Sequence, residues 1–203
     1  ALMRPPGPAA MGLMPAHASG DEPVFALKEI VVASDNSTRG LDPHQGAVLV
    51  HDGVTGELIA LLNASPITEI RTAAVSAVAT KLLAREGSSS VAILGSGIQG
   101  RSHAVAMREV IADIDLRVWS RTLEHAEALA LEAHGIACAS IEEAVRDAAV
   151  VCVCTSSPEP VLELEWLAPG AHVNAVGSSV PWACELAPTL FAAASVFVDR
   201  RES

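Results

Sequence analysis

Three glycines form the clearest chemical motif in the sequence. Gly95, Gly97 and Gly100 make the pattern Gly-x-Gly-x-x-Gly, whose intervening residues are Ser96, Ile98 and Gln99. An apolar stretch at 91–94 precedes the motif, and a helical pattern at 98–112 follows it. In this setting the first glycine permits a tight turn, the second lets the backbone approach a pyrophosphate, and the third lets the helix pack on the sheet. The helix N-terminus offers N–H donors to the phosphates. The motif predicts a dinucleotide site, with a flexible glycine turn as the alternative.

The end of the next predicted strand indicates which dinucleotide is bound. NAD-binding proteins commonly carry Asp or Glu there for the ribose 2′-hydroxyl, whereas this chain has Ser120, Arg121 and Thr122. A guanidinium pairs with a 2′-phosphate, and the two hydroxyls can donate to it. NADP(H) is therefore favoured over NAD(H). Alternatively, Thr122 caps the following helix and Arg121 is solvated.

The elements that must position these residues alternate between strand and helix from residue 88 onward. We expect strands at 91–94, 116–119, 136–139, 150–154, 173–176 and 196–198, and helices at 98–112, 123–134, 141–148 and 187–194. This alternation is typical of βαβ units in a parallel sheet. The predicted fold class is α/β, with a doubly wound sheet of Rossmann type.

The first part of the chain has a different pattern. Residues 1–20 are rich in Pro, Gly and Met and are expected to be irregular, and strands are predicted at 24–33, 45–51 and 57–63. An Ala-rich helix is predicted at 69–85, with Thr68 as its N-cap. This start puts Arg71 in the first turn, where a basic group opposes the helix dipole. Arg71 is therefore either a ligand for an anion or an ordinary solvated arginine.

Composition and charge exclude several classes of protein. Half of the 203 residues are hydrophobic and 18% are charged, which is a core-forming composition and excludes wholesale disorder. Thirteen basic and 24 acidic residues give a net charge of −11, which argues against a nucleic-acid or anionic-membrane surface. No uninterrupted apolar run is long enough to predict a membrane span.

The four cysteines indicate neither a metal site nor a disulfide framework. They form no Cys-x-x-Cys pair, and no histidine cluster lies beside them. Cys152 and Cys154 alternate in an apolar run, so both should face the same side of a strand. We expect buried free thiols in a reducing compartment, and hence a cytoplasmic protein.

Several segments together resemble the ornithine cyclodeaminase/mu-crystallin family. They occur in one order along nearly the whole chain: Gly12-Leu13-Met14-Pro15, His44-Gln45-Gly46, Thr68 to Ala77, the Gly95 to Gly100 turn, Ser102-His103, and Asn174-Ala175-Val176-Gly177. The resemblance implies a β-rich substrate domain beside the Rossmann domain, dimerisation through the former, and an active site between the two. It also implies an oxidoreductase acting on C–N bonds of small amino or imino acids.

Individual site residues follow from the same resemblance. Lys28 matches a lysine at the substrate, and Arg71 matches an arginine that grips the substrate carboxylate. Arg4 matches a second carboxylate-binding arginine, although the prolines after it depart from the pattern. For Lys28, an edge-strand lysine reaching water is the alternative. His103 is either near the cofactor or structural. The remaining expected cofactor contacts are Thr72, Thr155, Ser156, Val176 and Gly177.

One departure bears on the reaction. Ser179 stands where ornithine cyclodeaminases have an Asp, and a hydroxyl is not a base near neutral pH without an activator. The sequence therefore favours an NADPH-dependent ketimine reductase, in which Ser179 contacts the substrate. Cyclodeaminase, amino-acid dehydrogenase and a non-catalytic NADPH-binding crystallin-like protein stay as alternatives.

The length predicts the domain organisation. Family members are longer at both ends, so the chain is expected to hold a complete cofactor domain and part of a substrate domain. The expected divisions are 1–68 for the partial β-rich domain, 69–87 for a connecting helix, and 88–203 for the NADP-binding domain.

Overall fold

The computed structural model describes residues 2–3, 9–42, 44–177 and 184–198. The chain divides into two compact units, Ala1–Ile70 and Arg71–Ser203, and each is described by itself. No helix in these described ranges is both long and apolar enough to cross a membrane.

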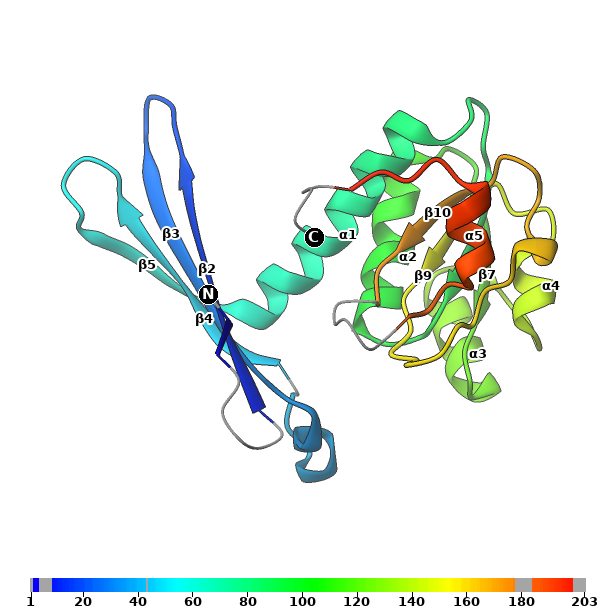
Figure 1. The fold of residues 1–203 in the computed structure, drawn as a ribbon, viewed down its shortest axis with the longest axis horizontal. Coiled ribbons are helices and arrows are strands. Elements are labelled where there is room, and N and C mark those ends of the chain that lie inside the picture. The colour runs from blue at the N-terminus through cyan, green and yellow to red at the C-terminus, as the bar shows by residue number, and fades with distance from the viewer. Residues whose placement is uncertain (1, 4–8, 43, 178–183, 199–203) are drawn as a thin grey trace. The chain divides into compact units, whose positions relative to one another are not determined.

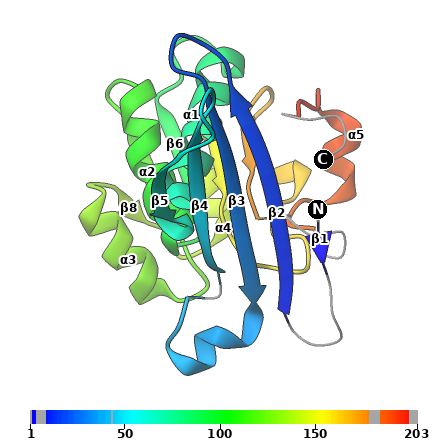
Figure 2. The ribbon, with the colours of Figure 1, turned by 90° about the vertical axis from the view of Figure 1, so that its left-hand side faces the viewer.

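The first unit is an antiparallel sheet with strand order β1-β2-β3-β4-β5 (Figures 1 and 2). The strands are β1 (Leu2–Met3), β2 (Ala9–Ala18), β3 (Val24–Ala33), β4 (His44–Asp52) and β5 (Leu58–Asn63), and a 3₁₀ helix, η1 (Ser34–Arg39), follows β3. The expectation of an irregular segment up to residue 20 is wrong, because β2 pairs with β3 along its whole length. The described pairs of β1 with β2 are at Met11 and Gly12 and do not include Pro15, which suits a residue that lacks a backbone N–H.

The helix α1 (Ala64–Leu83) begins earlier than expected. The side chain of Asn63 accepts a hydrogen bond from the amide of Ser65 at 2.9 Å, which satisfies one free donor of the first turn. Pro66 fits in that turn because its position needs no N–H. Thr68 is therefore inside the helix rather than its cap, and Arg71 is in the second turn. The argument from an unfavourable charge at the helix N-terminus is wrong.

The second unit contains a parallel sheet with strand order β10-β9-β6-β7-β8. Its strands are β6 (Ser90–Leu94), β7 (Asp115–Trp119), β8 (Ile136–Ala137), β9 (Val150–Val153) and β10 (His172–Ala175). The helices are α2 (Ile98–Val110), α3 (Leu123–Glu132), α4 (Ile141–Val145) and α5 (Pro188–Ala193), with a 3₁₀ helix, η2 (Leu164–Trp166). The order reverses between β6 and β9, which is the switch point of a doubly wound sheet. The α/β fold class is confirmed.

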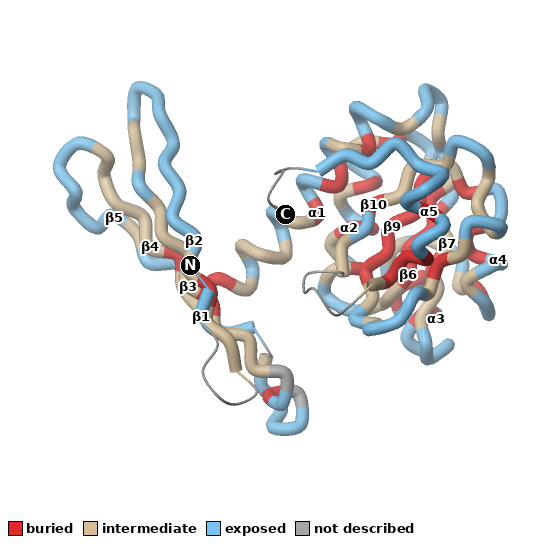
Figure 3. Tube along the Cα trace, in the orientation of Figure 1, coloured by how far each residue is buried: buried red, intermediate tan, exposed pale blue. Residues whose placement is uncertain are grey.

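Alternate strand residues feed two hydrophobic layers, one on each face of this sheet. Val91, Ile93 and Cys152 pack with α2, α3 and Ala77, whereas Ala92 and Val151 pack with α4 and α5. The central strands β6 and β9 are therefore buried almost throughout, and Figure 3 shows them in red, whereas β8 and β10 are mostly half-buried or exposed. Cys152 and Cys154 share one layer, as expected. Cys138, Cys152 and Cys154 are buried free thiols, whereas the free thiol Cys184 is half-buried rather than buried. Burial raises the pKa of Cys152 to about 12, so this thiol is inert.

The strand expected at 196–198 is not present. These residues are irregular and exposed, and no described strand lies beyond β10. An apolar Val-Phe-Val run forms a strand only where a neighbouring strand accepts its hydrogen bonds. The β-propensity of these three residues was therefore not enough to predict a strand.

Candidate functional site

The glycine turn joins β6 to α2 at the carboxyl end of the sheet. Gly95 has φ +111°, a conformation that other residues rarely adopt, and a Cβ there would lie 2.5 Å from the carbonyl oxygen of Cys154. A Cβ on Gly100 would overlap the carbonyl oxygen of Gly95. These two glycines therefore allow the turn, β9 and α2 to pack closely, as the sequence predicted.

Gly97 differs from these two glycines. It is exposed, its φ of −73° and ψ of −170° suit any residue, and a Cβ there would meet no heavy atom within 4 Å. Neither the backbone conformation nor the internal packing therefore requires a glycine at this position. The open space lies at the N-terminus of α2, where the first amides have no intrahelical acceptor. This arrangement is a cradle for an anion approaching the backbone.

Gln99 adds a second sign of an incomplete site. Its side-chain oxygen Oε1 is buried and has no hydrogen-bond partner within the described structure. Buried polar atoms normally have a partner, so a ligand donor is one way to satisfy this oxygen. The cradle over Gly97 and this acceptor both fit a bound dinucleotide.

The turn is tied to the end of β7. The amide of Gly95 donates to the carbonyl oxygen of Trp119 at 2.8 Å, and the Ser96 hydroxyl donates to the Ser120 hydroxyl at 2.8 Å. Arg121 is exposed. Thr122 occupies the N-cap of α3, but its side chain makes no capping hydrogen bond and is exposed. The structure therefore groups the turn with Ser120, and it leaves the Arg121 and Thr122 side chains accessible.

The ends of β9 and β10 meet through a residue that the sequence reasoning missed. The Glu185 side chain accepts hydrogen bonds from the Thr155 hydroxyl and, at 2.6 Å, from the Gly177 amide. Glu185 is fully buried, and burial raises its pKa while hydrogen bonds from Thr155 and Gly177 oppose the rise. The available signal was an acidic residue between Cys184 and the apolar Leu186. Ser156 is exposed, and Val176 is half-buried.

His103 lies on α2, behind the turn. Its Nδ1 donates to the carbonyl oxygen of Gln99 at 2.7 Å, so Nε2 is the acceptor for the Ser76 hydroxyl of α1 at 2.9 Å. It is fully buried, and burial lowers its pKa below the ordinary value of 6.5. His103 is thus a neutral ring that links α1 to the helix of the glycine turn.

Lys28 belongs to the first unit. It lies in the middle of β3, paired with Met14 of β2 and Val48 of β4, so the edge-strand alternative is wrong. The side chain is half-buried, and Nζ donates to the Thr68 hydroxyl at 2.6 Å. That hydroxyl donates in turn to the carbonyl oxygen of Ala64 at 2.7 Å. The ammonium is therefore oriented toward the first turns of α1.

The other predicted substrate residues are less defined. Arg71 is exposed on α1, in the second unit, and Thr72, a predicted cofactor contact, is half-buried beside it. Arg4 and Ser179 lie outside the described residues. Within the described ranges no group of three or more His, Cys, Asp or Glu side chains could hold a metal ion.

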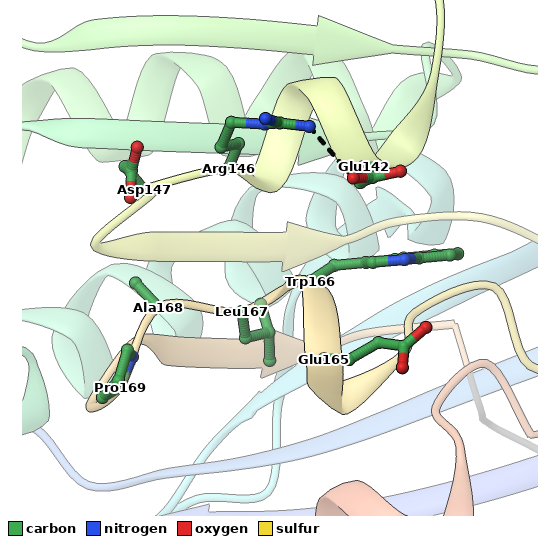
Figure 4. A pocket seen from close by; sticks show the side chains of 8 residues that line it. All are labelled: Glu142, Arg146, Asp147, Glu165, Trp166, Leu167, Ala168 and Pro169. Atoms are coloured by element: carbon green, nitrogen blue, oxygen red, sulfur yellow. Dashed lines mark hydrogen bonds and ion pairs between the residues drawn. The ribbon is translucent and has the colours of Figure 1, made fainter.

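A cavity of about 300 Å³ lies elsewhere in the second unit (Figure 4). Asp147 comes shortly before β9, and Ala168 and Pro169 come shortly before β10. The cavity is therefore at the amino end of the strands, opposite the glycine turn. On one side of the cavity Arg146 pairs with Glu142, four residues earlier, at 3.0 Å. Ligands of open α/β sheets bind at the carboxyl ends, so this cavity is not the predicted site.

The fold and the turn define a dinucleotide-binding domain of Rossmann type. Comparison with known proteins then narrows the class. The model of the ornithine cyclodeaminase/mu-crystallin family matches residues 5–203, and the chain belongs to this family.

Three relatives illustrate the similarity. Ketimine reductase mu-crystallin of Mus musculus is 40% identical over 195 residues, which cover 95% of this chain and 62% of the mouse protein. The structure of Thermococcus litoralis Delta(1)-pyrroline-2-carboxylate reductase in complex with NADH and L-proline is 30% identical, with a TM-score of 0.75 over 82% of this chain and 53% of that one. An archaeal alanine dehydrogenase dimer with bound NAD is 27% identical, with a TM-score of 0.85 over 92% and 58%. The chain thus spans less than two thirds of their lengths.

Proposed function

We propose that the protein is an NADPH-dependent reductase of imino acids. The observation that carries the proposal is the cradle at Gly97, an open approach to backbone amides at the switch point of the sheet. The substrate class is supported by the similarity to a ketimine reductase and to a pyrroline-2-carboxylate reductase. When bound, the nicotinamide supplies a hydride to the carbon of the C=N bond.

The choice of NADPH rests on the end of β7. No carboxylate stands at Ser120, Arg121 or Thr122 to repel a 2′-phosphate. Arg121 is exposed, and Thr122 does not use its hydroxyl as a helix cap, so both are accessible to a phosphate. The two structural relatives contain NADH and NAD, so the proposed preference for NADPH rests on this chain's own residues and not on those relatives. Comparing the dissociation constants of NADPH and NADH tests it.

The substrate roles fall to Lys28 and Arg71. A guanidinium binds a carboxylate through two parallel hydrogen bonds, and the exposed Arg71 has no described ion-pair partner. The Lys28 ammonium is held by Thr68 and can donate to the imine nitrogen. Reduction adds one hydride to carbon and one proton to nitrogen, and Lys28 delivers or orients that proton. Arg4 and Ser179 are proposed to complete the substrate contacts.

We also propose that the protein is a homodimer. Among the described residues of the first unit, the buried hydrophobic side chains are Ile30, Val48 and Ala64, whereas large apolar side chains of its strands are exposed: Met14, Phe25, Leu58, Ile59, Leu61 and Leu62. A sheet must bury its apolar face against another layer, and the alanine dehydrogenase relative is a dimer. Sedimentation equilibrium measures the molar mass and tests the dimer directly.

The activity is tested by mixing the purified protein with NADPH and a cyclic ketimine carboxylate. Absorbance of the reduced nicotinamide should fall only when both are present. An Arg71→Ala variant should lose this activity and keep its affinity for NADPH. Ammonia release from ornithine, lysine or alanine would instead indicate a cyclodeaminase or dehydrogenase, and NADPH binding without turnover of any imino acid would indicate a binding protein.

A further inference from the structure

A fully buried carboxylate joins two strand ends at the carboxyl edge of the parallel sheet. Glu185 has no exposed surface, and its two oxygens accept from different places. One accepts from the hydroxyl of Thr155, just after β9, and the other from the amide of Gly177, just after β10, at 2.6 Å. The Thr155 hydroxyl also accepts from the Ser157 amide at 3.1 Å. The side chain therefore bridges the segments that follow the two strands.

The backbone around Glu185 is fixed as firmly as its side chain. Its carbonyl oxygen accepts from the amides of Val161 at 2.8 Å and Leu162 at 3.3 Å, and Leu162 pairs with Leu186 in a parallel bridge. A Cβ on Gly177 would overlap both the Thr155 carbonyl oxygen and the Glu185 carboxylate. Glycine is thus required for the approach, and the three residues form an interlocked cluster, called here the Glu185 clamp (Thr155, Gly177 and Glu185).

A hydrophobic side chain at this position would avoid the desolvation of a carboxylate. The carboxylate instead supplies two acceptors to two donors that follow different strands, Thr155 after β9 and Gly177 after β10. A buried donor without an acceptor is costly, so the clamp holds the two strand ends in one relative position. The buried carboxylate of Glu185 therefore fixes the positions of the segments that follow β9 and β10.

The location of the clamp indicates what this precision serves. A dinucleotide lies across the carboxyl edge at the switch point, with its pyrophosphate at the first βα turn and its adenosine ribose at the end of the second strand. Here these positions are the turn after β6 and the end of β7. The other half of the dinucleotide therefore extends over β9 and β10, where Thr155 and Gly177 lie.

We propose that Glu185 is a positioning residue for the nicotinamide half of the bound dinucleotide. It sets the surface formed by the ends of β9 and β10, against which the ring must lie for hydride transfer. The inference rests on the proposed function for its cofactor. Glu185 itself touches neither the cofactor nor the substrate.

The test separates the two halves of the cofactor. Two probes, NADPH and 2′,5′-ADP, are titrated by calorimetry into the wild-type protein, Glu185→Met and Glu185→Gln. Met has a similar size but offers no acceptor. Gln keeps an oxygen for the Gly177 amide and can donate to the Thr155 hydroxyl. Fluorescence of the reduced nicotinamide is recorded as a second readout of the ring's surroundings.

Glu185→Met should bind NADPH at least tenfold more weakly and lose the nicotinamide fluorescence change. Its affinity for 2′,5′-ADP should stay within about twofold, because the adenosine half lies over β6 and β7. Glu185→Gln should stay within about threefold of wild type for both probes. Glu165→Gln, on the exposed η2 helix, is the control and should match wild type.

If the Met variant does not fold, Glu185→Asp retains the charge but shortens the reach, and it should show the same selective loss at smaller size. An equal loss for both probes, or no loss for NADPH, would overturn the positioning role and leave the proposed function intact. If the wild-type protein binds neither NADPH nor NADH, the proposed function fails first, and the role of Glu185 fails with it.

Discussion

The two glycines Gly97 and Gly100 should respond in opposite ways to the same substitution. In Gly97→Ala the new methyl group enters open space, and the backbone angles already suit alanine. Loss of a glycine N-cap costs about 0.5–1 kcal/mol, and the reduced entropy of the unfolded chain offsets about 0.4–1 kcal/mol. The free energy of unfolding should therefore change by less than about 0.5 kcal/mol.

Cofactor affinity should fall sharply in Gly97→Ala. The methyl group occupies the space through which a phosphate reaches the backbone amides of α2. Each hydrogen bond to a charged group contributes about 1.5–3 kcal/mol, so the loss of one weakens binding roughly tenfold to a hundredfold. Calorimetric titration with NADPH, together with thermal denaturation without cofactor, measures both quantities on one preparation.

Gly100→Ala is the matched comparison. Its methyl group would overlap the carbonyl oxygen of Gly95, so α2 must shift from the sheet. Overpacking of this kind costs about 1–3 kcal/mol, and the thermal midpoint should fall by about 2–4 °C for each kcal/mol. If Gly97→Ala bound NADPH as wild type does, or were as unstable as Gly100→Ala, the assignment of separate roles to these glycines would be refuted.

Three other substitutions test other parts of the site. Arg121→Ala should weaken the binding of NADPH about tenfold and leave the affinity for NADH within about twofold, because only NADPH has a 2′-phosphate that can form a charge-assisted hydrogen bond with Arg121. Titration with both cofactors tests this. Lys28→Met should lower turnover of a ketimine acid by at least about 10²-fold while NADPH affinity stays constant, and a parallel loss of binding would contradict it. In His103→Gln the stability should depend less on pH. The folded-state pKa of His103 lies below 6.5, so the unfolded chain binds more protons at this group. The contribution of His103 to stability is therefore fully present above pH 6.5 and is lost as the pH decreases toward the folded-state value. Denaturant titrations between about pH 7 and 5 show whether the slope becomes shallower.

The cofactor half could be predicted because its signals are local. The glycine spacing, the apolar strand before it and the helix after it are adjacent in sequence, and strands buried on both faces give continuous apolar runs. The strand predicted at 196–198 was wrong because strand formation depends on a partner that is not adjacent in sequence. An apolar run contains no information on whether a neighbouring strand is present to pair with it.

Composition misled the interpretation of the first unit. The prolines and glycines around β2 suggested irregular chain, but Pro15 is in register with Leu27 of β3 and Gly12 lies against Ile30. Pairing with the long strand β3 outweighs the low β-propensity of these residues. Similarly, Thr68 was chosen as the N-cap of α1, whereas the structure has Asn63 accepting from the Ser65 amide, and the wrong start led to the mistaken argument about Arg71.

Contacts between distant residues explain what the sequence could not reveal about α1. This helix is rich in alanine, which provides little side-chain shape to fix how it packs. Three of its hydroxyl groups have specific partners that no local pattern indicates: Thr68 accepts from Lys28 in the first unit, and in the second Ser76 donates to His103 while Thr80 accepts from the Asn174 amide at 2.9 Å. A shift of α1 by one residue in the second unit would leave the Ser76 hydroxyl and the Nε2 atom of His103 without their described partners, at a cost of about 1–3 kcal/mol each, and would remove the Thr80 hydroxyl from the Asn174 amide. The hydroxyls therefore select the register of the helix, and Thr68 orients Lys28, a candidate site residue whose partner lies 40 positions away in the sequence.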